Sequence, residues 1–269
     1  MAPERHLVIA AHPDDETIGL GARLARLRDV TVVFATDGAP ADMIDARRLG
    51  FANARSYARC RLREARQALA LAGVSSARVF TLGGPDGALV ERIAEVTGTI
   101  VELLQALGVT DLWSHPYEGG HPDHDATAVC ARAALVLHGR AGQKLPRSHE
   151  FTSYHRGPGA GDVVWGSFLD PNGAVAGPAP PVEQRPLHES ETEVKRRMLA
   201  CYESQRLVLH LVPLGAEPAR RAPTYHFARA PHAGSLLYEL RWAAVEASRW
   251  RARAAAELAK LGLSAQAAL

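Results

Sequence analysis

The chain has 269 residues, 47% of them hydrophobic, which is enough apolar material for a sizeable core and excludes a disordered chain. Its 31 basic and 29 acidic residues leave a net charge of +2, and no dense basic run is present, so a nucleic-acid-binding protein is not expected. The three cysteines are far apart and include no CxxC pair, so neither a disulfide framework nor a thiolate zinc site is expected.

The N-terminus enters a strand pattern almost at once. It shows no apolar stretch as long as a signal peptide or a membrane span. A cytoplasmic location without an integral membrane segment is therefore the default expectation.

Strand-like and helix-like segments alternate through the first half. Short apolar runs ended by turn signals predict buried strands at 6–12, 30–38, 78–84 and 110–116. Apolar residues at helical spacing predict helices at 16–28, 53–72, 89–107 and 121–137, with an Arg-rich loop between the second strand and the second helix. This alternation predicts an α/β fold that is Rossmann-like, with a mostly parallel twisted sheet and helices on both faces.

The second half is less regular. Strands are expected at 149–155 and 162–170, and a helix at 190–205 with Ser190 as N-cap and Glu193 completing a capping box. The Pro- and Gly-rich stretch 170–186 is predicted to be a loop, either a lid or a connection.

The Ala-rich tail, 235–262, is predicted to be helical and anchored by Leu236, Leu237, Leu240 and Trp250. With no internal repeat and no domain boundary, we expect one domain over 1–269. Its Rossmann-like core would be 1–140, and 141–269 would be a variable, substrate-covering part with a C-terminal α/β elaboration.

Two tetrapeptides combine imidazole and carboxylate groups: His-Pro-Asp-Asp at 12–15 and His-Pro-Asp-His at 121–124. Each has a proline after its first histidine, the residue favoured at the first position of a helix. In open α/β sheets, ligands bind beyond the carboxyl ends of the strands, and the first motif directly follows such an end. Burying these groups is costly unless something pairs with them, so they are expected to gather around a cation.

Their chemistry favours hydrolysis. Two imidazoles and one carboxylate on a metal with open positions form a catalytic rather than a structural pattern. A metal acidifies water and polarises a carbonyl, a spare carboxylate accepts the proton, and a donor stabilises the oxyanion. A single His-Pro-Asp is commonly just a capped helix start, but two of them in one α/β pattern are better explained by a shared site.

The two turns resemble those of the PIG-L/LmbE de-N-acetylases, which include deacetylases of N-acetylglucosaminyl-phosphatidylinositol, of mycothiol and bacillithiol precursors and of glycopeptide antibiotics. The resemblance extends over about residues 7 to 205 through further segments: FATDG (34–38), RLREARQALALAGV (61–74), LGGPDGAL (82–89) and KRRMLACYESQ (195–205).

The resemblance implies a divalent metal, typically zinc, held by His12, Asp15 and His124. It implies that Asp14 is the general base that deprotonates the water, and that His121 stabilises the oxyanion or protonates the leaving amine. Our mechanistic hypothesis takes His121 to be protonated when it holds the oxyanion.

Positions that contact the sugar in sugar-processing relatives correspond to Arg61 and Asp86. Some relatives have a tyrosine two residues before the second motif, where this chain has Gly119. Tyr117 is the nearest tyrosine and would substitute if its loop bends toward the metal.

Other readings remain open. Gly19-x-Gly21 after the first strand, with Asp37 ending the second, suggests an NAD-dependent oxidoreductase, but the acidic turn would repel a pyrophosphate. The same metal ligands suit non-haem iron oxygenases, and Fe²⁺ remains an alternative to Zn²⁺. A metal-dependent amidase acting on a non-sugar substrate and a non-catalytic member of the fold are further alternatives. The expected partner is a small N-acetylated molecule, and a homo-oligomer is left open.

Overall fold

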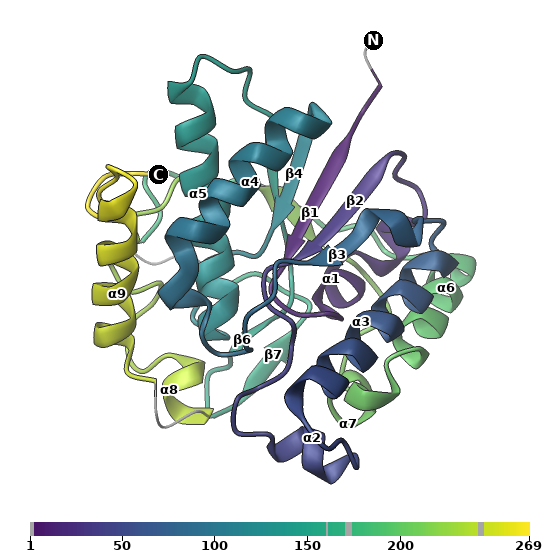
Figure 1. Cartoon of the computed structure of the whole chain (residues 1–269). Helices are drawn as coiled ribbons and strands as arrows, with labels where there is room; N and C mark the ends of the chain where they lie inside the picture. Colours follow the sequence, from purple (N-terminus) through teal and green to yellow (C-terminus); the bar gives the residue numbers. More distant parts are fainter. Residues whose placement is uncertain (1–2, 160, 170–173, 242–244) are drawn as a thin grey trace.

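A computed structural model describes residues 3–159, 161–169, 174–241 and 245–269. A seven-stranded sheet in the order β3-β2-β1-β4-β5-β9-β8 forms its centre (Figure 1). The strands of the first half are β1 (His6–Ala10), β2 (Val30–Phe34), β3 (Val79–Thr81), β4 (Asp111–Ser114) and β5 (Arg147–Phe151). These five pair in parallel, and β9 (Ala219–Arg221) and β8 (Val182–Glu183) continue the sheet in antiparallel pairing. The predicted α/β fold with a mostly parallel sheet is confirmed.

Helices cover both faces of this sheet because successive strand residues point to opposite sides. On β1, Leu7 and Ile9 belong to one apolar cluster, whereas Val8 and Ala10 belong to the other. The first cluster lies under α4 (Ile93–Leu107), α5 (Pro122–Arg140) and α9 (Ala247–Lys260), and the second under α1 (Asp15–Leu24), α3 (Ala54–Leu71) and α6 (Glu189–Ala200) (Figure 1).

The first half contains one helix that the sequence did not predict. The Arg-rich loop holds the short α2 (Ile44–Arg48). Elsewhere the predicted elements are present with shifted ends, and 3-10 turns precede two of them: η1 (Ser76–Arg78) before β3 and η2 (Leu89–Arg92) before α4. Asn53 caps α3 by accepting the Ser56 N–H, which fixes where this helix begins.

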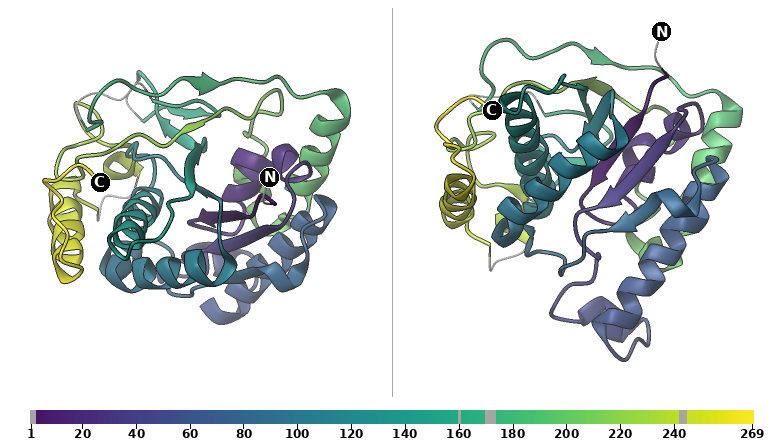
Figure 2. Two further views of the ribbon diagram at one scale, coloured as in Figure 1. Left: turned by 90° about the horizontal axis from the view of Figure 1, so that it is seen from above. Right: turned by 45° about the horizontal axis from the view of Figure 1, so that its top comes forward.

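The second half departs further from expectation. A hairpin of β6 (Tyr154–Arg156) and β7 (Val163–Trp165) follows β5. Residues 170–173 of the expected Pro/Gly loop lie outside the described residues. The remaining part of that loop contacts the fold at two places: Ala174 is buried in the core, and β8 pairs with β9. Figure 2 shows this segment running along the molecule toward α6.

The expected ends of the next helix are wrong. It begins at Glu189 with His188 as N-cap, whose backbone N–H donates to Glu191, so neither Ser190 nor Glu193 has the predicted capping role. It is followed by η3 (Glu203–Gln205) and α7 (Arg206–Leu209).

The described tail forms α8 (Leu237–Arg241) and α9. Leu236, Leu237 and Trp250 are buried anchors as expected, but Leu240 is 44% exposed. No helix among the described residues combines the length and the apolar character needed to cross a membrane. The expectation of a single domain over 1–269 stays a prediction.

Candidate metal centre

The first motif lies in the turn between β1 and α1. The helix begins at Asp15, two residues after Pro13, so the expected proline at the first helical position is not found here. Asp14 precedes it with φ 149° and ψ −29°, a conformation that residues other than glycine rarely adopt. Its backbone N–H donates to Glu16 Oε2 at 3.1 Å. Such a strained residue persists only where its surroundings hold it, and such strain is concentrated at functional sites.

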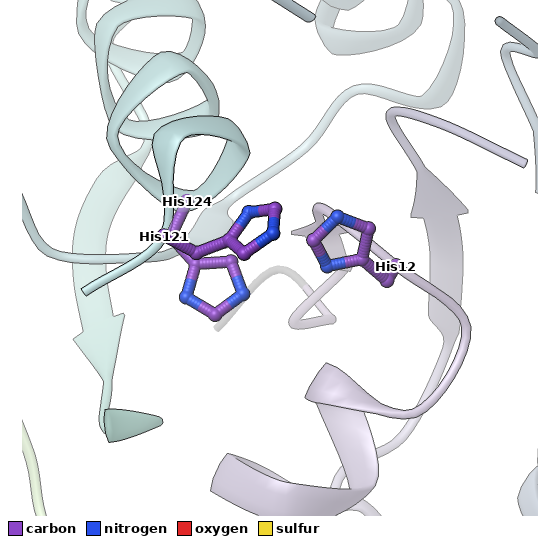
Figure 3. Close-up of side chains that lie close together, drawn as sticks. All are labelled: His12, His121 and His124. Atoms are coloured by element: carbon purple, nitrogen blue, oxygen red, sulfur yellow. The ribbon is translucent and has the colours of Figure 1, made fainter. Parts of the chain in front are cut away.

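The second motif follows the prediction. His121 is the N-cap of α5, with Pro122 at the first helical position, and its Nδ1 accepts the Asp123 N–H at 3.2 Å. His124 lies one turn further along, and Figure 3 shows the rings of His121 and His124 directed toward His12 from the start of this helix.

The two motifs meet, as their spacing predicted. The Asp15 carboxylate lies 3.1 Å from His12 Nδ1 through one oxygen and 3.1 Å from His124 Nε2 through the other. One nitrogen from each of His12, His121 and His124 falls within 4.8 Å of the others, as do ligand atoms of Asp15, His115 and His124. Within the described part of the chain, His124 Nε2 is buried and forms no well-aligned hydrogen bond, although the Asp15 oxygen lies 3.1 Å away. A buried, unsatisfied imidazole nitrogen beside a carboxylate fits a divalent cation.

Charge supports the same reading. Asp14, Asp15, Asp86 and Asp123 place four carboxyl groups in one largely buried space. Burial lowers the pKa of His12, but Asp86, Asp123 and Asp15 outweigh burial and hold it well above the ordinary value. Burial raises the pKa of Asp15, yet His124 and His115 hold it well below its usual range. The site therefore requires positive charge, which a bound cation supplies.

Asp14 is not among the residues that meet at the imidazoles and lies against a guanidinium instead. Arg61 Nη2 is 2.8 Å from Asp14 Oδ2 and also donates to the carbonyl of Pro13 at 3.1 Å. Burial outweighs the neighbouring Arg61 and raises the pKa of Asp14 to about 7. A carboxyl group tuned this close to neutral pH is suited to accept and release a proton.

Asp86 lies at the centre of the cluster. Its Oδ1 is 3.2 Å from His12 Nε2 and 3.6 Å from His121 Nε2, and its Oδ2 is 3.9 Å from Arg61 Nη1. Burial opposes ionisation, but His12 and His121 lower the pKa of Asp86 below its ordinary value. Both Asp86 and Arg61 are thus placed at the site, and their contact with a sugar stays a prediction.

The environment of His121 disfavours the protonated form that the mechanistic hypothesis assumed. Burial, followed by the neighbouring His12, lowers the pKa of His121 to about 4, so the imidazole is neutral at pH 7. Since Nδ1 accepts the Asp123 N–H, the neutral ring carries its proton on Nε2. Neutral His121 therefore still presents an N–H donor toward the cluster.

Three residues at the site were not among the predicted site residues. Asp123 accepts the N–H groups of Gly87 at 2.6 Å and Leu89 at 3.1 Å, and lies 3.2 Å from His12 Nε2. The His115 ring stacks on His124 at 4.0 Å, and Tyr154 packs against His124 at 5.2 Å. Asp123 lies inside the second motif and His115 at a strand end, so both carried a sequence signal. Tyr154 carried none, because β6 brings it in from the irregular half.

Tyr117 does not reach the cluster. Its hydroxyl donates to the Arg229 carbonyl at 2.9 Å, and its ring packs against Tyr225, Phe227 and Trp250 in the core. The loop does not bend toward the metal ligands, because Asp125 accepts the N–H groups of Glu118 and Gly119 at 3.1 and 3.0 Å. These contacts give no support to a role of Tyr117 in substrate binding, which stays a prediction.

Comparison with known proteins finds similar sequences and folds. A family model described as PIG-L, GlcNAc-PI de-N-acetylase, matches residues 7–135, which contain both motifs. The 1D-myo-inositol 2-acetamido-2-deoxy-alpha-D-glucopyranoside deacetylase 2 of Catenulispora acidiphila is 29% identical over 164 residues. That match covers 52% of this chain and 54% of the relative, so the chain spans about half the length of the curated relative it matches.

Solved structures agree in fold. The N,N'-diacetylchitobiose deacetylase from Pyrococcus horikoshii is 19% identical with a TM-score of 0.57, over 82% of this chain and 85% of that one. A structure described as the zinc inhibited form of teicoplanin deacetylase is 17% identical with a TM-score of 0.57, over 81% and 98% of the two chains. From the family match, the fold and the meeting of the two His-Pro-Asp motifs, residues 7–135 are assigned to the PIG-L family of GlcNAc-PI de-N-acetylases, the LmbE-like deacetylases, and the chain shares the fold of the solved structures.

Proposed function

We propose that the protein is a metal-dependent hydrolase that removes an N-acetyl or related N-acyl group from an amino sugar or glycoconjugate. One observation carries this proposal: the buried Asp14 carboxyl group, held by Arg61 at 2.8 Å, is the sequence neighbour of Asp15, the carboxylate that lies 3.1 Å from both His12 and His124. The family match supports the same reaction class.

His12, Asp15 and His124 would hold the metal, for which zinc is our first proposal and Fe²⁺ the alternative. When bound, such a cation acidifies water and polarises the acyl carbonyl. His115 and Asp123 orient the ligands, since His115 stacks on His124 and Asp123 lies against His12.

The chain's own groups then move the protons. Asp14 takes a proton from the attacking water, and Arg61 keeps its carboxylate in place at 2.8 Å. The Nε2–H of neutral His121 donates to the developing oxyanion. The C–N bond breaks, the proton held by Asp14 passes to the departing amine, and the products are acetate and a free amine.

The dinucleotide alternative fits the site less well. The start of α1, where a pyrophosphate would bind, carries the carboxyl groups of Asp14, Asp15 and Glu16, and all three side chains are buried. A cytoplasmic location and a homo-oligomer stay predictions.

The test is acetate release from a panel of N-acetylglucosaminyl-inositol, N,N'-diacetylchitobiose, N-acetylglucosamine and an acyclic N-acetyl amine. Each is assayed with the metal-free protein and after addition of one equivalent or an excess of Zn²⁺ or Fe²⁺. The excess arm matters because a relative is described as zinc inhibited. We expect release from the sugars, loss with chelator and recovery at one equivalent. Turnover that survives complete metal removal contradicts the proposal, and turnover of the acyclic amide alone favours a non-sugar amidase.

A further inference from the structure

Three groups of Asp14 are held by hydrogen bonds: its carbonyl oxygen accepts the N–H groups of Thr17 and Ile18 at 2.9 Å, and its N–H and carboxylate each have a further partner. Its strained backbone donates its N–H to Glu16 Oε2 at 3.1 Å. Its carboxylate pairs with Arg61 at 2.8 Å. Whatever fixes Glu16 and Arg61 therefore also fixes Asp14.

Glu16 is fixed by a residue from the second half of the chain. The Glu16 side chain is fully buried, and its Oε1 accepts hydrogen bonds from the Tyr202 hydroxyl and from Thr17 Oγ1. The Tyr202 and Thr17 oxygens are themselves 3.1 Å apart, so the three groups form a closed buried triangle. Tyr202 therefore sets the position of the carboxylate that accepts the Asp14 N–H.

Arg61 is fixed through its helix by the same segment. Ser204 donates to Glu64 from both its backbone N–H, at 3.1 Å, and its hydroxyl, at 2.6 Å. Gln205 Nε2 donates to the Tyr57 hydroxyl at 2.7 Å. Glu64 and Tyr57 lie one turn to either side of Arg61 on α3, so these bonds clamp the part of the helix that carries the guanidinium.

A third contact joins this segment to α1. Lys195 is 1% exposed, and its Nζ donates to the Ile18 carbonyl at 2.8 Å while lying 3.2 Å from Glu217. A buried ammonium group needs polar partners because its burial is costly. By donating to Ile18, Lys195 attaches its segment to the first turn of α1.

We propose that residues 195–205, which we call the brace, hold Asp14 in its strained conformation and so set the geometry of proton transfer. The proposal rests on the proposed function, because it takes Asp14 to be the base. Tyr202 and Ser204 are positioning residues: they act through Glu16 and Glu64, respectively. This gives a role to two sequence motifs that the metal site leaves unexplained, the Arg61-x-x-Glu64 helix and the Tyr202-x-Ser204-Gln205 turn.

The first test compares Tyr202→Phe with a matched control, Tyr225→Phe. Each change removes a buried tyrosine-to-glutamate hydrogen bond, since Tyr225 donates at 2.7 Å to Glu150 of β5, which has no hydrogen bond to Asp14 within the described residues. We expect Tyr202→Phe to lower kcat roughly 10- to 100-fold, the range typical of a slightly misplaced catalytic group, with KM and metal content unchanged. Tyr225→Phe should leave kcat unchanged.

Equal kcat values for the two variants overturn the proposal, and so does a loss of bound metal in Tyr202→Phe that accounts for the lost activity. Should Tyr202→Phe fail to fold, Ser204→Ala is the second variant, since it removes only the hydroxyl bond to Glu64. It should also lower kcat without changing KM, and an unchanged kcat counts against the brace.

A measurement without substrate separates this proposal from the proposed function. In the wild-type background, Asp14→Gly should be more stable than Asp14→Ala, because glycine adopts the local φ of 149° more readily than alanine. If Tyr202 holds the strain, this difference shrinks when Tyr202→Phe is added, because the backbone can then relax. An undiminished difference overturns the brace, even if the wild-type protein releases no acetate from the panel and the proposed function has failed.

Discussion

The strain at Asp14 leads to a quantitative prediction about stability. Asp14→Gly and Asp14→Ala both remove the carboxylate and its 2.8 Å pair with Arg61, so that loss cancels when the two variants are compared. They differ in the backbone. A residue held in a sparsely populated conformation costs about 1–3 kcal/mol. Asp14→Ala would carry this conformational cost at φ 149°, whereas the glycine of Asp14→Gly adopts positive φ readily.

Glycine has an opposing effect. It makes the unfolded chain more flexible, which lowers the free energy of unfolding by about 0.4–1 kcal/mol. The balance favours Asp14→Gly over Asp14→Ala by about 1 kcal/mol, or about 2–4 °C in Tm for a domain of this size. Urea unfolding in excess EDTA measures it, since chelation keeps metal affinity out of the comparison. If Asp14→Ala were instead more stable than Asp14→Gly by the usual advantage of alanine over glycine, about 0.4–1 kcal/mol, the reasoning about strain would be refuted. Neither variant should turn over substrate.

Three further predictions concern the ligands, a buried acid and the glycines. Asp14→Asn should lower turnover by about 10²–10⁴-fold and leave the metal content intact. His12→Ala should lose metal, as measured by elemental analysis. A His12→Ala protein that still holds one equivalent of metal would contradict the ligand set. Burial outweighs Arg220 and raises the pKa of Glu118 from 4.5 to about 8. Between these two pH values the folded state binds a proton that the unfolded state has released. The free energy of unfolding should therefore fall as the pH rises from 4.5 to about 8, and level off above pH 8. Glu118→Gln should remove this part of the pH slope in urea titrations at pH 5, 7 and 8.5, and an unchanged slope would show that Glu118 ionises normally. Gly120→Ala should destabilise the fold because its Cβ would lie 2.1 Å from the Tyr154 carbonyl oxygen, whereas Gly98→Ala in α4, with no neighbour within 4 Å, should stabilise it by about 0.5–1 kcal/mol; similar thermal shifts for both would refute this contrast.

The sequence predicted the fold of the first half because the signals there are local. Runs such as Leu7–Ala10 are apolar at every position, which only a strand covered on both faces requires. The meeting of His12 with His124 followed from the same reasoning, since both motifs lie beyond the carboxyl ends of neighbouring parallel strands, β1 and β4.

Other features depend on contacts between distant segments and left no local pattern. Tyr154 reaches His124 only because β6 passes against Gly120, whose missing Cβ leaves room for the strand. The orientation of Tyr117 is decided by two backbone bonds to Asp125, a residue eight positions away. The φ of Asp14 is likewise set by buried partners that arrive from residue 61 and, through Glu16, from residue 202. No periodicity within a window of the sequence encodes such contacts.

The two edge strands of the central sheet are short. β3 has three residues and β8 has two, so the unpaired backbone groups at each border are few. A neighbouring copy would find little template there on which to add a strand, which protects the protein against fibre-like association. Copies that do associate are therefore not expected to extend the central sheet from one molecule into the next.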